Sequence, residues 1–481
     1  MPLKIAIAGA TGFVGQALAR RLADGPEGHQ VVALTRSASP RPPEGRLEWR
    51  SCDLFSARAT EEALAGCDAA VYLVHSMLPS ARLTQASFQD LDLILADNFA
   101  RAADKAALRR VVYLGGILPA DDLSAHLESR REVEETFRRA RTPFVALRAG
   151  LVIGADGSSF QILEKLVRRL PLMLLPSWTR TPTQPIALAD VVELLARTLD
   201  APGPGLEGEA FDVGGPEVTD YAGLLAAAAQ AQGLVRRTLP VRWFSPGLST
   251  LWVCLITGAP RELVKPLVQS LRHRMVAADR RLQERLGVPG VGLVEALAQA
   301  LRLRPGPRTP RAEAPPPGRS LLFGARRSGP ESDVRSVQRL PLPPGWSAED
   351  VARAFTHWLP DGFRPFLSIG TDAAGEVRFG IRGLRWQLLV LHHVDGRSTP
   401  ERQVFRVTGG LLARTGGPRQ GRLEFRAVLG GAFVLAAIHD FTPTLPWYVY
   451  KATQALVHLW VMRAFGRFLG ARPVGERPGA G

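Results

Sequence analysis

Short apolar runs alternate with amphipathic segments along the first 150 residues of this 481-residue chain. Six of these runs are predicted β-strands, at residues 4–8, 31–35, 47–52, 69–74, 110–114 and 144–148. Segments with apolar residues at helical spacing are predicted helices, at residues 16–22, 60–64, 91–106 and 127–139. Near-continuous apolar strands are typical of parallel sheets that helices cover on both faces. The pattern therefore predicts a doubly wound α/β sheet, followed by a mainly helical lobe over residues 157–300.

The hydrophobic period changes after this lobe. Residues 304–318 contain six prolines, which favour an extended spacer over a helix or a central strand. We therefore divide the chain into a first unit at residues 1–303, a linker at 304–329, a second unit at 330–470 and a flexible tail at 471–481.

The second unit combines alternating and helical patterns. Leu423, Phe425, Ala427 and Leu429 alternate with polar residues, which predicts a half-buried antiparallel strand. Residues 387–393, 403–412 and 433–440 are predicted to be further strands, and residues 447–469 a helix. A helix packed across a curved antiparallel sheet is the simplest α+β arrangement for this order.

The closing helix carries an apolar stripe that has two interpretations. Its members recur at helical spacing and are Leu456, Val457, Trp460, Val461, Ala464, Phe465 and Phe468. The stripe is predicted to be core that faces the sheet. The alternative is an anchor on a membrane surface, because Trp, Tyr and Arg occur together and Lys451, Arg463 and Arg467 lie outside the stripe.

Three glycines follow the first predicted strand at a spacing of three residues. The candidate phosphate-binding residues of this loop are Gly9, Thr11, Gly12, Phe13, Val14 and Gly15. The turn needs a residue without a Cβ, a pyrophosphate needs close approach of the backbone, and the helix has to pack closely on the strand. The N–H groups and the positive dipole end of the helix then favour phosphate. Strand, loop and helix in this order predict a Rossmann-type dinucleotide site.

Residues after the neighbouring strands indicate which dinucleotide is bound. An NAD site usually carries an acidic residue after the second strand, whereas this chain has Arg36 and Ser37. A guanidinium suits a 2′-phosphate, so NADP(H) is predicted and NAD(H) is the alternative. Otherwise Arg36 is only a solvated loop residue. The other predicted contacts are Asp53 and Leu54 beside the adenine, and Leu73, Val74 and His75 beside the nicotinamide.

The charge distribution and the histidine pattern argue against other partners. The formal net charge of +15 divides into +6 for residues 301–330, +7 for 331–481 and only +2 for 1–300. No helix-turn-helix, zinc-finger or RNA-stacking motif is present, so nucleic acid is not a predicted partner. His392 and His393 are adjacent on a predicted strand and point to opposite faces, so no metal is predicted.

The cysteines and the apolar runs bear on location. Cys52, Cys67 and Cys254 form no CxxC pair and are predicted to be buried thiols of a reducing compartment. The chain begins without a basic leader, and no apolar run reaches the ~20 residues of a membrane span. A cytoplasmic protein without a transmembrane segment is predicted, and peripheral membrane contact remains open.

Together these motifs resemble the atypical short-chain dehydrogenase/reductase superfamily, including NmrA-like proteins and the 39-kDa-type nucleotide-binding subunit of respiratory complex I. The resemblance is carried by the loop at 9–15, Arg36, Asp53, Leu54 and residues 147–154. Residues 214–217, Tyr221 and residues 252–271 are similar to a bacterial subgroup that ends in the domain of unknown function 2867 (DUF2867). This resemblance implies a START-like helix-grip fold for the second unit and a helical substrate lobe in the first.

The resemblance also implies catalytic residues, and the chain departs from them. Catalytic members use a Ser after the fifth strand and a Tyr-x-x-x-Lys on the next helix. Here the fifth strand ends in Gly115 and Gly116, and the helix carries His126 and Arg130 at the corresponding spacing. His126 could donate a proton near neutral pH, and Arg130 could hydrogen-bond ribose hydroxyls. The alternative is that His126 is a helix-start residue and Arg130 a surface cation.

Two functions therefore remain open. The first is an NADP(H)-dependent oxidoreductase that passes a hydride to an apolar carbonyl or quinone-like substrate. The second is a non-catalytic NADP(H)-binding sensor or scaffold, whose C-terminal domain binds an apolar ligand or a membrane-associated partner. The replaced catalytic residues favour the second function, whereas the complete phosphate loop is compatible with both.

Overall fold

The chain forms two compact units, which are described separately. The first contains Met1–Leu78 and Leu95–Phe323, and the second contains Pro79–Ile94 and Gly324–Gly481. The computed structural model describes residues 1–37, 41–76, 83–120, 123–201, 205–241, 246–303, 334–362, 367–371, 376–384, 386–415 and 420–472. The predicted linker at 304–329 and nearly all of the predicted tail lie outside these residues.

A seven-stranded parallel sheet forms the centre of the first unit. Its spatial order is β12 (Ala210–Val213), β7 (Phe144–Ala149), β6 (Arg110–Gly116), β4 (Ala69–Tyr72), β1 (Lys4–Ala8), β2 (Gln30–Thr35) and β3 (Leu47–Ser51). The strand order reverses between β1 and β4, as in doubly wound folds. The predicted Rossmann-type sheet is confirmed. The sequence pattern missed β12, because four residues within a mainly helical stretch give no detectable alternation.

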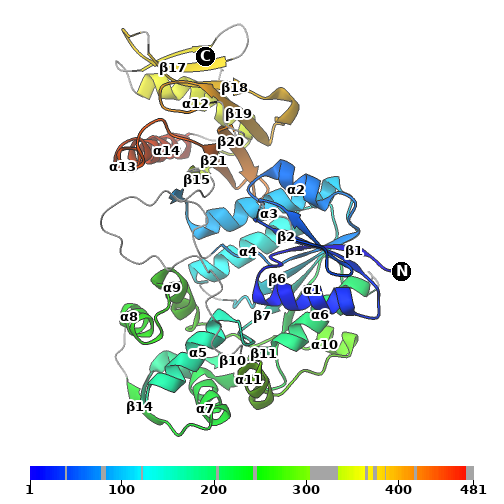
Figure 1. The fold of residues 1–481 in the computed structure, drawn as a ribbon. Coiled ribbons are helices and arrows are strands. Elements are labelled where there is room, and N and C mark those ends of the chain that lie inside the picture. Colours follow the sequence, from blue (N-terminus) through cyan, green and yellow to red (C-terminus); the bar gives the residue numbers. More distant parts are fainter. Residues whose placement is uncertain are drawn as a thin grey trace. The chain divides into compact units, whose positions relative to one another are not determined.

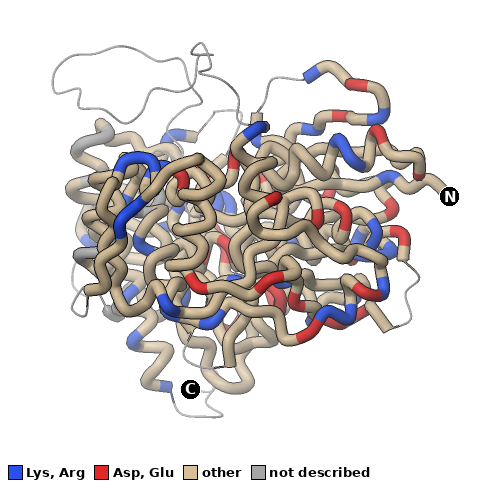
Figure 2. The backbone as a smooth tube through the Cα atoms, turned by 90° about the horizontal axis from the view of Figure 1, so that it is seen from below, with Lys and Arg blue, Asp and Glu red and all other residues tan. Residues whose placement is uncertain are grey.

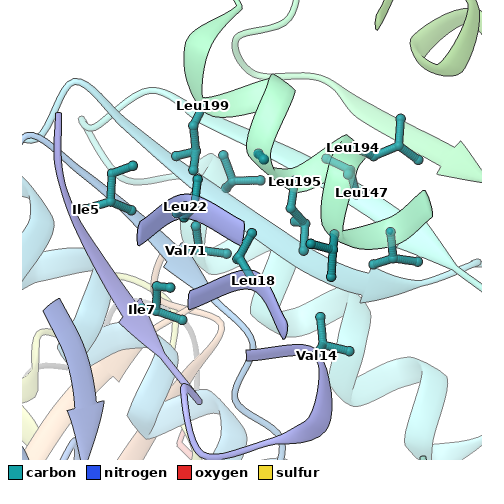
Figure 3. Close-up of a cluster of buried hydrophobic side chains, with 14 of the residues drawn as sticks. Ile5, Ile7, Val14, Leu18, Leu22, Val71, Leu147, Leu194, Leu195 and Leu199 are labelled. Carbon is teal, nitrogen blue, oxygen red and sulfur yellow. The ribbon is translucent and has the colours of Figure 1, made fainter. Parts of the chain in front are cut away.

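Helices cover both faces of this sheet (Figure 1). Helices α1 (Phe13–Asp24) and α6 (Leu188–Asp200) lie on one face, and α2 (Ala57–Leu64), α3 (Phe88–Lys105) and α4 (Ala125–Arg138) lie on the other. On the first face, Leu18 and Leu22 of α1 and Leu195 of α6 pack against the strands (Figure 3). On the second face, the ring of Tyr72 lies 5.0 Å from that of Phe99. Burial on both faces explains why the central strands are largely apolar, whereas the edge strand β3 contains an exposed Glu48 and a half-buried Arg50.

The rest of the first unit is mainly helical, as predicted, but it also contains short strand pairs. Its helices are α5 (Ser158–Arg169), α7 (Tyr221–Ala231), α8 (Pro246–Thr257), α9 (Arg261–Ser270), α10 (Arg281–Leu286), α11 (Leu293–Arg302) and the 3-10 helix η1 (Ser177–Arg180). The strand pairs are β8 (Val152–Ile153) with β11 (Ile186–Ala187), β9 (Leu172–Pro176) with β14 (Arg237–Val241), and β10 (Pro182–Thr183) with β13 (Thr219–Asp220).

The second unit is an α+β domain built on an eight-stranded sheet. Its spatial order is β16 (Leu367–Thr371), β17 (Glu376–Ile381), β18 (Gln387–His393), β19 (Arg402–Gly409), β20 (Arg422–Val428), β21 (Phe433–Phe441), β15 (Val334–Pro341) and β5 (Leu83–Gln85). The helices are α12 (Ala348–Gly362), α13 (Trp447–Ala452), α14 (Gln454–Gly470) and the 3-10 helix η2 (Asp395–Arg397). The ring of Phe355 on α12 lies 5.3 Å from Phe425 and 5.1 Å from Phe465. The predicted antiparallel sheet with a packed helix is confirmed, apart from the parallel pair of β15 and β5.

Strand β5 joins this sheet from far earlier in the chain. It pairs with β15 in a parallel register that aligns Gln85 with Ser336. The amide of Gln338 donates a hydrogen bond to the Gln85 carbonyl (2.7 Å), and the Arg339 guanidinium donates to the Asp90 carboxylate (2.8 Å). Three residues carry too little pattern to predict a strand, so only the tertiary structure shows this insertion.

The apolar stripe of the closing helix does not form one buried face. Leu456, Val457 and Trp460 are 53–57% exposed, whereas Phe465 is fully buried and Phe468 packs beside it. The stripe covers a wider arc of the helix than the sheet can bury. The predicted single helix is also interrupted, because the backbone of Thr453 (φ −125°, ψ −83°) separates α13 from α14.

The alternation in β20 predicts that its polar residues are exposed, and for two of them this prediction is wrong. Leu423 and Phe425 are in the core as predicted, but Glu424 and Arg426 are buried too, at 2% and 1% exposure. The Glu424 carboxylate accepts hydrogen bonds from Arg402 (2.8 Å) and from Arg426 (2.6 Å), and these bonds compensate the buried charges.

Two of the three cysteines are buried. Cys52 and Cys67 are 3% and 7% exposed, and Cys254 is half-buried. Burial raises the pKa of the Cys52 thiol to about 12, so this thiol resists ionisation. Among the described residues, no helix combines the length and the apolar character that crossing a membrane requires.

The environment of His458 predicts a pH-dependent stability. His458 lies on α14, its Nε2 is 3.1 Å from the Ser336 hydroxyl, and burial lowers its pKa to about 4. As the pH falls from about 6.5 to 4, His458 takes up a proton in the unfolded chain but stays neutral in the folded chain. We expect the free energy of unfolding to fall by about 2 kcal/mol across this window, after allowance for partial exposure.

Urea unfolding at the two ends of this window checks the expectation. The wild-type midpoint should fall at the acidic end, and His458→Gln should reduce this fall, whereas His357→Gln, at an exposed site on α12, should leave it intact. An equal fall in the His458→Gln variant would show that other groups cause it.

Candidate functional site

The glycine loop leaves no room for side chains at two positions. Gly9 has φ +87°, and a Cβ there would lie 3.1 Å from the backbone of Leu73, which follows the neighbouring strand β4. A Cβ on Gly15 would lie 2.2 Å from the Gly9 carbonyl oxygen. The Gly12 amide donates a hydrogen bond to that same oxygen (2.9 Å), which closes the turn. The backbone of this turn therefore requires glycine at positions 9 and 15, whether or not a ligand is bound.

No side chain caps the amino end of α1, which follows the glycine loop. Gly12 is the N-cap residue, it makes no side-chain capping bond, and the first turn contains no acidic residue. The N–H groups and the positive end of the helix dipole therefore remain available to an anion.

A cavity of about 300 Å³ opens at this helix end. The residues that line it come from the loop, from the carboxyl ends of β4, β6 and β7, from the start of β8, and from helices α4, α5 and α9. They include Gly9, Gly12, Phe13, Val14, Gly15, Leu73, His75, Leu114, Gly115, Gly116, His126, Arg130, Leu151, Val152, Ser158, Ser159 and Leu267. Carboxyl ends of parallel strands at a switch in strand order are the usual ligand position of doubly wound folds.

Two histidines meet at the wall of this cavity. His75 Nε2 lies 3.1 Å from His126 Nδ1, and the ring centroids are 4.8 Å apart. His75 follows β4, and His126 lies in the first turn of α4, whose N-cap Ser124 accepts a hydrogen bond from the Leu127 amide. The contact brings together two residues that were predicted for different roles, cofactor binding and catalysis.

Arg130 lies one helical turn after His126 and lines the same cavity. Its backbone carbonyl accepts a hydrogen bond from the Tyr113 hydroxyl (3.3 Å), which ties α4 to β6. Gly116, at the end of β6, faces this helix: a Cβ there would lie 3.6 Å from Leu127 and 3.9 Å from Arg130. Those distances are ordinary contacts, so sterics would allow a serine at this position.

A buried ion pair fixes α4 to the sheet. Both oxygens of Glu134, which is 2% exposed, accept hydrogen bonds from the Arg148 guanidinium on β7 (2.7 and 2.8 Å). Arg138 donates to the same carboxylate (2.6 Å). A bidentate pair restricts the orientation of both partners, so it helps to hold the helix that carries His126 and Arg130.

The other predicted cofactor contacts lie at the same edge of the sheet but outside the cavity lining. Arg36 and Ser37 are exposed after β2, and Leu54, after β3, is buried. The Asp53 carboxylate accepts a hydrogen bond from the Phe55 amide (3.2 Å). Thr11 is exposed in the loop, and Val74 is half-buried between two cavity residues, Leu73 and His75.

Sequence reasoning missed much of the cavity wall, including two serines of α5 and a leucine of α9. Ser158 and Ser159 begin α5 after the N-cap Gly157, which makes no side-chain capping bond. A glycine before two serines at the start of an amphipathic helix was the available signal. Leu267 reaches the cavity from α9, where Ser270 Oγ lies 3.0 Å from Oγ of Ser124, the N-cap residue of α4. No local pattern distinguishes this leucine from core.

Comparison with known proteins agrees with this geometry. Residues 9–166 match a family model described as NAD(P)H-binding. A 117-residue stretch is 32% identical to the auxiliary protein GraX of Staphylococcus aureus; it covers 24% of this chain and only 37% of the length of GraX.

Solved structures share the fold of the first unit. A nucleoside-diphosphate-sugar epimerase from Staphylococcus aureus superposes with a TM-score of 0.50 at 15% identity, and a triphenylmethane reductase from Citrobacter sp. with 0.50 at 17%. Each superposition covers 62% of this chain and 100% of the other chain. At such identities the likeness establishes the fold alone. Together with the matched family model, it makes the N-terminal region an NAD(P)-binding domain.

Proposed function

We propose that the first unit is an NADP(H)-dependent reductase of the atypical short-chain type, with an apolar carbonyl or quinone-like substrate. One observation carries the proposal: the ring of His126 borders the same cavity as the glycine loop and lies 3.1 Å from His75. A group that can donate a proton thus lies beside the place where the loop would hold a nucleotide.

The cavity suits both partners of this reaction. The tight glycine loop and the acid-free first turn of α1 favour a pyrophosphate, and Leu114, Leu151, Val152 and Leu267 supply apolar walls for the substrate. Bound NADPH would supply the hydride. The Arg130 guanidinium would hydrogen-bond ribose hydroxyls.

His126 would supply the proton. In its cationic form, Nδ1–H would donate to His75 Nε2, and Nε2–H would donate to the carbonyl oxygen of the substrate. When Nε2 releases its proton, neutral His126 keeps the bond to His75, so the ring stays in place. A carbonyl that gains one hydride and one proton becomes an alcohol, and a quinone becomes a quinol.

A non-catalytic NADP(H)-binding sensor or scaffold is the second candidate. Gly116 favours it, because the catalytic serine of related enzymes is absent from a position that has room for one. In this function the second unit, as a START-like domain of the DUF2867 type, would bind an apolar ligand.

NADPH oxidation measured against a panel of quinones and aldehydes separates the two candidates. The reductase function requires at least one panel member to oxidise NADPH catalytically. If NADPH binds in the micromolar range and none does, the sensor function stands and the reductase function is abandoned.

The choice of NADP(H) rests on Arg36 and has its own test. We expect Arg36→Asp to weaken NADPH binding about tenfold or more, through loss of a charge-assisted contact with the 2′-phosphate, and to change NADH binding little. Fluorescence titration with each nucleotide measures both values. Arg20→Asp, at an exposed site on α1, is the control for net charge. An equal loss for both nucleotides would contradict the assignment.

A further inference from the structure

The exposed face of α14 is not explained by nucleotide binding. Its buried face consists of Ala455, Met462, Phe465 and Leu469, each at most 1% exposed, and it packs in the core of the second unit. On the exposed face, Leu456, Val457 and Trp460 leave more than half of their surface in solvent. Three neighbouring large apolar side chains on one surface helix are typical of an interaction surface.

Two basic residues lie on the same exposed face. Residues 456, 460, 463 and 467 recur at helical spacing, so the exposed guanidiniums of Arg463 and Arg467 follow Trp460 along the helix. Residues 447–472 contain four basic residues and no Asp or Glu. Figure 2 shows basic and no acidic positions on the described part of the chain that leads to the C-terminus.

A groove runs beside this exposed face of α14. Trp460, Arg463 and Arg467 line it from α14, and residues 338–341 line it from β15, around a volume of about 600 Å³. The groove combines an aromatic ring with guanidiniums, which are the groups that contact lipid headgroups at membrane interfaces.

We infer that this surface, formed by Leu456, Val457, Trp460, Arg463 and Arg467, docks on an anionic lipid bilayer. The apolar residues would enter the headgroup region, and the guanidiniums would pair with lipid phosphates. The charge pattern decides against a second copy, because two acid-free helices face to face would bring their arginines together. This inference is independent of the proposed reductase function.

Co-sedimentation of the full-length protein with vesicles tests the inference. We expect binding to phosphatidylcholine–phosphatidylglycerol vesicles, little binding to pure phosphatidylcholine, and weaker binding as salt is added. The pair Arg463→Glu and Arg467→Glu, and the pair Val457→Ser and Trp460→Ser, should each weaken binding about tenfold. Point variants are needed because deletion of the helix would also remove Phe465 from the core.

Matched controls come from the same unit. Trp386→Ser replaces a tryptophan that is 57% exposed, and Arg353→Glu with Arg378→Glu reverses two exposed charges. These variants should bind vesicles as the wild type does, and circular dichroism should show every variant folded. Equal binding to both vesicle types, or unchanged binding of the α14 variants, overturns the inference. So does a concentration-dependent increase in mass without vesicles that the α14 variants abolish, since it would identify a second copy as the occupant.

Discussion

A Gly15→Ala variant is expected to lose NADPH affinity by more than about 100-fold, or about 3 kcal/mol. The added Cβ would lie 2.2 Å from the Gly9 carbonyl oxygen and 2.7 Å from the Ala10 Cα. Both neighbours are backbone atoms, so the loop itself has to move. The same carbonyl accepts the hydrogen bond from Gly12 (2.9 Å), and its displacement would reorient the N–H groups at the amino end of α1, where a phosphate is expected to bind.

A graded series makes this test specific. A Cβ on Gly12 would lie 3.2 Å from the Gly9 carbonyl oxygen, so Gly12→Ala should lose less affinity than Gly15→Ala. Gly396→Ala adds a methyl group with no atom within 4 Å and should bind as the wild type does. Isothermal titration with NADPH measures the order, and circular dichroism confirms folding. Wild-type affinity in a folded Gly15→Ala variant would contradict the loop as the nucleotide site.

Replacement of His126 by alanine is expected to lower turnover about 100-fold with the most active panel substrate. The affinity for NADPH should change little, because the glycine loop and α1 are untouched. His75→Ala should lower turnover less, since it removes the partner that orients His126 and leaves the proton donor. His357→Ala, at an exposed site on α12, is the control.

The pH profile distinguishes a proton donor from a structural residue. Wild-type turnover should fall as the pH rises and His126 loses its proton, and this dependence should disappear in His126→Ala. A variant with reduced turnover and an unchanged pH profile would assign His126 a structural role. Unchanged turnover would remove it from the mechanism.

The geometry of the glycine loop could be predicted from the sequence because it is local. Gly9, Gly12 and Gly15 lie within one strand–turn–helix unit, and glycine readily adopts the positive φ found at Gly9. The central strands of the first sheet were found for a similar reason: burial on both faces leaves continuous apolar runs, as in β1, β2 and β4.

The residues that surround the glycine loop in the cavity could not be predicted in this way. His75 and His126 are 51 residues apart in sequence, and only the sheet order places the end of β4 beside the start of α4. Leu267 looks like any core leucine until α9 brings it to the cavity. Strand β5 is too short to show a period, yet it extends the sheet of the second unit, whose other strands begin about 250 residues later in the chain.

The sequence by itself determined the glycine loop, the parallel sheet and the change of period near residue 304, since each depends on local backbone preference or on repeating burial. The tertiary structure alone decided which residues meet. It paired His126 with His75, buried Glu424 with Arg426, and turned Phe465 inward while Trp460 remained exposed. A hydrophobic pattern encodes that a residue prefers burial, and packing against distant elements decides whether the fold has a place for it.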